Sequence, residues 1–115
     1  MNKLYSLEKL EEIAQGDNVF IQNMITTFID NVSEEIKNIP KFIDAGKWNT
    51  IKSIAHKLAP SYSYMDAESL FALAANIEKE IRYEGDLSEI TTMTHQMYAE
   101  SLVLIDELKK NFDKQ

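Results

Sequence analysis

The sequence contains no cysteine among its 115 residues, which excludes a disulfide framework, a zinc–thiolate site and a thiol nucleophile. Glycine and proline are scarce, with three and two copies, and so few turn residues favour long helices over a sheet of many strands. No apolar run approaches the ~20 residues of a membrane span. Residues 1–5 also lack the apolar core of a signal peptide. We therefore expect a cytoplasmic protein without a membrane segment.

Positive charge is in the minority, because 12 lysine and arginine residues face 19 aspartate and glutamate residues, for a net charge of −7. An acidic surface repels phosphate backbones, so nucleic acid is not an expected partner. Hydrophobic residues make up 44% of the chain. Both this content and the length suit one core in a single domain over residues 1–115.

Apolar residues recur at spacings of three and four along most of the chain, which predicts amphipathic helices. A short first helix should end at Gly16, and Asp17 should cap a long second helix that breaks near Lys37–Pro40. The next helix should run from Trp48 to about Tyr64. Two more should follow, one capped by Asp66 and one from about Leu87 or Ser88 to Asn111.

Short connections between helices favour antiparallel neighbours. The expected fold is therefore all-α, an up-and-down antiparallel four-helix bundle with a short extra N-terminal helix. The apolar stripes require no partner helix, so we expect a monomer.

Most large apolar residues are assigned to the core rather than to a ligand site. These are the methionines, Phe28, Phe42, Phe71 and, on the last helix, Leu102. Four acidic residues are expected on solvated helix faces, namely Glu34, Glu35, Glu78 and Glu80. Metal-binding bundles carry Glu-x-x-His repeats, but Ser53 and Thr92 stand three residues before the two histidines. No metal and no other cofactor is therefore expected.

His56 is the residue that packing does not explain. On a helix it points nearly opposite to the apolar side formed by Ile51, Ile54, Ala55 and Leu58. Its neighbours one turn away are Lys52, Ser53, Ala59 and Pro60, and three of these four are small or compact. Neutral imidazole is a nucleophile, and histidine side chains titrate near pH ~6.5. An open imidazole in this setting is suited to accepting a phosphoryl group. The other histidine, His95, is assigned to a surface or boundary position without a function.

Three segments carry a resemblance to a known family: Ala55-His56-Lys57-Leu58-Ala59-Pro60-Ser61, Met65-Asp66-Ala67-Glu68-Ser69-Leu70 and Ile77-Glu78. Together they resemble the histidine-containing phosphotransfer (HPt) domain family, and the resemblance extends over the whole chain. It implies a four-helix bundle that relays phosphoryl groups between receiver-domain aspartates in multistep two-component signalling. His56 would be phosphorylated, through Nε2.

The same resemblance implies a phosphoryl carrier rather than an enzyme, because the receiver domain supplies both the divalent metal and the acyl phosphate. The implied partner is a response-regulator receiver domain, a hybrid histidine kinase, or both. The chain is either free-standing or part of a hybrid kinase.

Two positions depart from the family pattern. Ala59 replaces a lysine that is thought to neutralise the phosphoryl group, and Asp66 replaces a glycine that gives room near the site. The first change weakens phosphate stabilisation, and the second is expected to add repulsion. Lys52, one turn before His56, is the candidate substitute for the lysine. Lys57 points about 100° away from His56 and is less suited.

A partner is expected to dock around His56, where small Ala59 and Ser63 allow close approach, and on second-helix residues between Ile21 and Phe28. Two alternative interpretations remain open. One is a degenerate HPt-like bundle that binds a receiver domain without carrying phosphate. The other is a helical interaction module or metal-binding bundle in which His56 is incidental.

Overall fold

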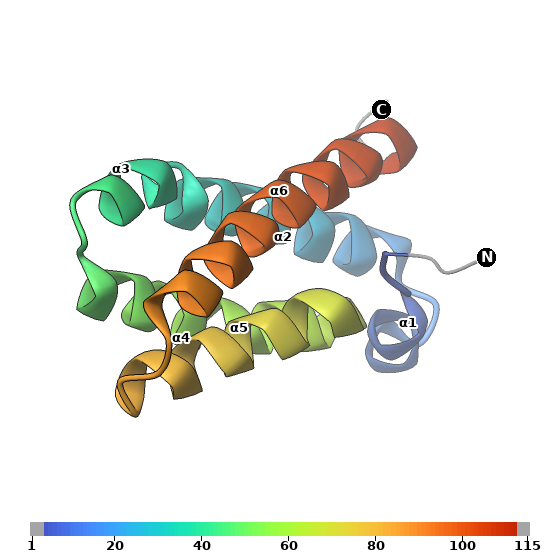
Figure 1. Cartoon of the computed structure of the whole chain (residues 1–115). Helices are drawn as coiled ribbons and strands as arrows, with labels where there is room; N and C mark the ends of the chain where they lie inside the picture. Colours follow the sequence, from blue (N-terminus) through green and yellow to red (C-terminus); the bar gives the residue numbers. More distant parts are fainter. Residues whose placement is uncertain (1–3, 113–115) are drawn as a thin grey trace.

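The computed structural model describes residues 4–112, and within that range it contains six α-helices and no strand (Figure 1). Residues 1–3 and 113–115, which belong to the expected 1–115 domain and include most of the N-terminal segment examined for a signal peptide, lie outside the described range. In chain order the helices are α1 (Glu8–Ala14), α2 (Asn18–Ile36), α3 (Ile39–Asp44), α4 (Trp48–Tyr64), α5 (Glu68–Arg82) and α6 (Leu87–Phe112).

The junction between α2 and α3 confirms the expected break. α2 ends at Ile36, residues 37–38 form a turn, and α3 then continues close to the course of α2 (Figure 1). Pro40 lies in the first turn of α3, where an amide hydrogen has no intrahelical acceptor and its loss costs little. The expected cap of α2 is also confirmed, because Asp17 Oδ1 accepts a hydrogen bond from the Phe20 amide at 3.0 Å.

The longer helices form the expected bundle, with the short α1 at one end. α4 and α5 pack side by side and make the most extensive helix–helix contact, while α6 packs on α5 and α2 (Figure 1). α1 contacts α2 and is tied to the end of α4, because the Ser6 amide donates to the Met65 carbonyl at 2.8 Å. This arrangement leaves one long side of α4 uncovered.

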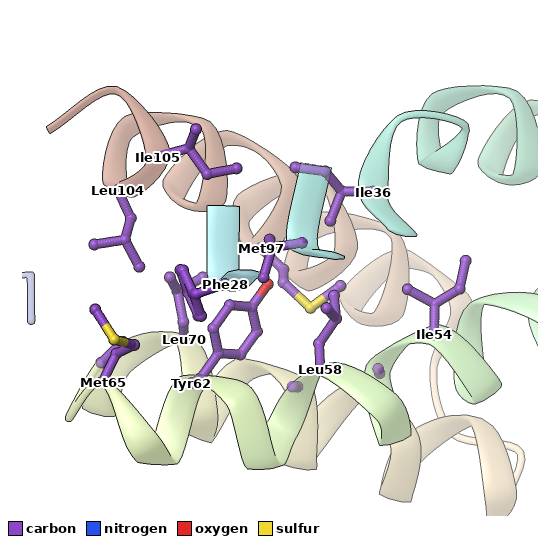
Figure 2. Close-up of a cluster of buried hydrophobic side chains, with 14 of the residues drawn as sticks. Phe28, Ile36, Ile54, Leu58, Tyr62, Met65, Leu70, Met97, Leu104 and Ile105 are labelled. Atoms are coloured by element: carbon purple, nitrogen blue, oxygen red, sulfur yellow. The ribbon is translucent and has the colours of Figure 1, made fainter. Parts of the chain in front are cut away.

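Buried side chains from α2, α4, α5 and α6 form one core (Figure 2). Tyr62 extends from α4 into this cluster and is fully buried. Its ring meets Phe28 edge to face, with centroids 6.3 Å apart, and its hydroxyl lies 2.7 Å from Ser101 Oγ on α6. Apolar burial supplies most of the stability, and the hydroxyl pair satisfies two buried polar groups. The inner face of α4 is thereby held against α2 and α6.

Two of the core assignments are wrong. Phe71 and Leu102 are 42% and 45% exposed, whereas Phe28, Met65 and Met97 are buried as expected. Each misplaced residue directly follows a buried one in its helix, and one residue along a helix rotates the side chain by about 100°. Phe42 is half-buried and packs against the edge of the core.

Candidate functional site

His56 lies in the middle of α4 with 72% of its side chain exposed. Its neighbours in the chain, Ile54, Ala55 and Leu58, are buried against the other helices. The sequence-based expectation that His56 faces solvent is therefore confirmed. His95, on α6, is exposed as well.

Glu78 of α5 is the side chain that the fold brings to His56. Both of its carboxylate oxygens lie 3.1 Å from His56 Nδ1, and only 18% of its side chain is exposed. The assignment of Glu78 to a solvated face is thus wrong, because its carboxylate lies against α4. Glu34 is exposed, and Glu35 and Glu80 are half-buried. The sequence signal for this partner is the Ile77-Glu78 pair, one of the three segments that resemble the HPt family.

The contact with Glu78 determines which nitrogen of His56 is free. An ionised carboxylate only accepts hydrogen bonds, so Nδ1 must carry the proton and donate it. The pKa of Glu78 lies below its ordinary value, mainly because its carboxylate accepts the hydrogen bond from His56. Burial opposes this lowering, whereas the positive charges of Arg82 and of a protonated His56 add to it. In the neutral ring the lone pair then resides on Nε2. Because Nε2 lies across the ring from Nδ1, the nucleophilic atom points away from Glu78.

Arg82 completes a row of three side chains. Its Nη2 lies 2.6 Å from Glu78 Oε2, one helical turn further along α5. Glu78 therefore connects the imidazole of α4 to a guanidinium on α5. Sequence reasoning did not single out Arg82, because nothing in the local pattern separates it from any other cation near a helix end.

The remaining residues expected near the phosphate occupy different sides of α4. Lys52 is half-buried and Ser53 is exposed, each within one turn of His56, while Ala59 is half-buried and Pro60 is exposed. The helix continues through Pro60 to Tyr64.

Lys57 is directed towards α2, where its Nζ lies 3.8 Å from Glu35 Oε2. That contact confirms the expectation that Lys57 points to another side of α4 than His56.

Ser63 and Asp66 lie at the end of α4, beside α1. Lys9 Nζ donates to the Ser63 carbonyl at 3.0 Å and lies 3.2 Å from Asp66 Oδ1. The expectation that Asp66 caps α5 is wrong, because Ala67 is the N-cap residue and makes no side-chain hydrogen bond there. Asp66 instead has a φ of +50°, a left-handed conformation in which glycine is favoured. That conformation gives a backbone reason for glycine at this position.

A hollow of about 210 Å³ lies between α1, α2 and α4, and its lining includes Met24, Thr27, Phe28, Ser61 and Tyr64. The first three belong to the second-helix stretch expected to meet a partner. Tyr64 is 51% exposed, and it follows His56 by eight residues, or roughly 12 Å of helix. The hollow therefore lies further along α4 than His56, towards the C-terminal end of the helix.

Within residues 4–112, no group of three or more histidine, cysteine, aspartate or glutamate side chains is placed to hold a metal ion. Over the same range, no helix combines the length and apolar character needed to cross a membrane.

A model of the Hpt domain family matches residues 23–111. Among curated proteins, the chain is similar to the virulence sensor protein BvgS of Bordetella bronchiseptica, Bordetella parapertussis and Bordetella pertussis, with identities of 24%, 23% and 22% over 106 residues. These alignments cover 91% of the chain but 9% of each relative, so the chain spans less than a tenth of the length of the relatives. No solved structure is significantly similar to it.

Proposed function

We propose, because the chain belongs to the Hpt domain family, that it carries a phosphoryl group on His56 between receiver-domain aspartates in two-component signalling. The observation that supports this function best is the arrangement of the imidazole. His56 is exposed, and Glu78 engages Nδ1, so Nε2 is open to a partner. A histidine without such a function requires neither feature.

The proposed transfer uses few groups of this chain. The lone pair of His56 Nε2 attacks the phosphorus of an aspartyl phosphate on the receiver domain. The bond from phosphorus to the aspartate oxygen breaks, and the aspartate leaves as a carboxylate. Because Nδ1 keeps its proton, the ring becomes cationic as the N–P bond forms, and Glu78 stabilises that charge at 3.1 Å. The reverse reaction passes the group to a second aspartate, so the chain acts as a carrier and not as an enzyme in its own right.

The charge along α4 suits an anionic group. α4 contains Lys52, His56 and Lys57 but no aspartate or glutamate, in a chain whose net charge is −7. An acid-free helix lowers the repulsion met by an incoming phosphoryl group. Lys57 is occupied by Glu35, so we propose Lys52 as the cation that supports the phosphoryl group in place of the family's lysine at Ala59.

The proposed docking surface for the receiver domain extends from His56 to the hollow lined by Met24, Thr27 and Tyr64. It combines a positively charged strip with apolar contact area, as protein–protein interfaces do. The apolar stripes are used inside one bundle, so the carrier is proposed to act as a monomer.

Phosphotransfer from a labelled, phosphorylated receiver domain, or from phosphoramidate, tests the central proposal. We expect acid-labile, base-stable label on the wild type and none on His56→Gln. His95→Gln is the matched control, since His95 is the chain's other histidine and is also exposed, and it should label normally. An unlabelled wild type that still binds the receiver domain would support the degenerate bundle, which the alanine at position 59 favours. Loss of both labelling and binding would leave a helical module with an incidental His56.

The role of Lys52 has its own test. Lys52→Ala should shorten the lifetime of the phosphohistidine or slow its formation, because a charge-assisted hydrogen bond to phosphate is lost. Lys57→Ala removes the same charge from the same helix but from the side facing α2, so it should have a smaller effect. Equal effects of the two substitutions would contradict a specific role for Lys52.

A further inference from the structure

Arg82 bonds to the same carboxylate that holds His56. We propose that Arg82 is a positioning residue that fixes the orientation of the Glu78 carboxylate, so that the neutral His56 ring keeps its proton on Nδ1. This inference rests on the proposed function, because it concerns how the imidazole is kept ready for phosphoryl transfer.

The geometry places Arg82 and His56 on one shared oxygen. Glu78 Oε2 lies 2.6 Å from Arg82 Nη2 and 3.1 Å from His56 Nδ1. Since both groups bond to the same atom, the guanidinium and imidazole nitrogens are at most ~6 Å apart. Glu78 Oε1, also 3.1 Å from Nδ1, is left to His56. A guanidinium is planar and directional, so this bond fixes the orientation of the carboxylate against α4.

Three helices contribute the charged side chains around His56. From α5 they are Glu78 and Arg82, and from α4 itself Lys52 and Lys57. From α2 the facing charge is Glu35, which is paired with Lys57.

Among these charged groups, Glu78 is the one that the structure bonds to the ring of His56. A carboxylate that is held in place accepts the Nδ1–H bond in one orientation, and the Nε2 lone pair then points away from it. A carboxylate that is free to rotate would hold the Nδ1–H form less firmly, so the bond from Arg82 acts on the tautomer of the ring.

A purely structural role for Arg82 predicts different behaviour. The Glu78–Arg82 pair is an i,i+4 pair whose arginine side chain is 52% exposed, and such surface pairs contribute little to stability. If Arg82 acts only on the helix, its removal should leave the share of the Nδ1–H form of His56 unchanged. If it acts through Glu78, that share should fall while the stability of the fold does not change.

The test measures the tautomer of the His56 ring by ¹⁵N NMR, at a pH well above the ordinary titration range of imidazole, in the wild type, Arg82→Gln and Arg82→Lys. The matched control is Lys79→Gln, which removes the same charge from an exposed neighbouring position on α5. We expect Arg82→Gln to lower the ratio of the Nδ1–H form to the Nε2–H form by about 1.5- to 5-fold, the worth of an exposed ion pair. Arg82→Lys should restore part of this ratio, because lysine keeps the charge but lacks the planar guanidinium. Lys79→Gln should leave the ratio unchanged.

A fall of this ratio in Arg82→Gln that is no larger than the change in Lys79→Gln would overturn the proposal. So would an equal fall when Arg82→Gln is introduced into Glu78→Gln, because the effect on the tautomer must pass through the carboxylate. The phosphotransfer rate supplies a second readout, since it should fall with the share of the Nδ1–H form. The NMR measurement needs no phosphate, so a wild type that fails to accept phosphate refutes the proposed function and leaves the test of Arg82 intact.

Discussion

The buried hydroxyl of Tyr62 links the helix that carries His56 to α6. Removing this hydroxyl should lower the free energy of unfolding by an amount that depends on pH. Burial raises the pKa of Tyr62 from 10.0 to about 12, against the smaller lowering effect of its hydrogen bond with Ser101. Near pH 8 the phenol is neutral in both the folded and unfolded states. There, Tyr62→Phe should destabilise the protein by about 1–3 kcal/mol, because the Ser101 hydroxyl, which is 1% exposed, loses its partner.

The difference in free energy of unfolding between the wild type and Tyr62→Phe should become smaller at alkaline pH. A group whose folded pKa is raised contributes stability that is fully present below its unfolded pKa and is lost as the pH rises through the folded one. For Tyr62 that window runs from 10.0 to about 12. One unit above the lower limit the loss is about 1.4 kcal/mol, and over the whole window it approaches roughly 3 kcal/mol. Phenylalanine has no such proton, so Tyr62→Phe escapes this loss.

The assay is urea unfolding of both proteins near pH 8 and near pH 11, with free energies from linear extrapolation. Ser101→Ala serves as the matched control, because it removes the same hydrogen bond but keeps the phenol and its alkaline loss. The double substitution should destabilise less than the two single ones together, since no buried polar group is left unpaired. If the gap between wild type and Tyr62→Phe is the same at both pH values, the Tyr62 hydroxyl is not desolvated as described.

Three further predictions concern the site and its surroundings. Ala59→Lys should lengthen the phosphohistidine lifetime by about 1.5- to 5-fold, because a partly exposed charge contact contributes that much. The decay of the base-stable label measures this lifetime, and an unchanged lifetime would contradict the prediction. Asp66→Gly should change the unfolding free energy in urea by less than about 1 kcal/mol, because relief of the positive φ offsets loss of the Lys9 contact, and it should leave the lifetime unaltered. Glu78 has a lowered pKa, so its contribution to stability is present above its ordinary value of 4.5 and is lost as the pH falls below it. The difference between wild type and Glu78→Gln should accordingly shrink on acidification, and a difference that grows would refute the assigned direction.

Features governed by short stretches of chain were predictable from the sequence. The Asp17 cap and the break before Pro40 depend on residues within one helical turn, where side-chain oxygens and missing amide hydrogens act directly on the backbone. The exposure of His56 follows in the same way, because a helix advances by about 100° per residue and the apolar neighbours determine which side is buried.

Features that depend on how two helices meet were not predictable in this way. Glu78 lies 22 residues from His56, and only the packing of α4 on α5 turns its carboxylate towards the imidazole and brings Arg82 with it. Asp66 was expected to cap a helix, but the path of the turn and the position of α1 direct it to Lys9. Helix phase is a local property, whereas the register between helices is decided by the packing of the whole core. The sequence alone thus determined that His56 faces solvent, and the tertiary structure decided which of its nitrogens is free to react.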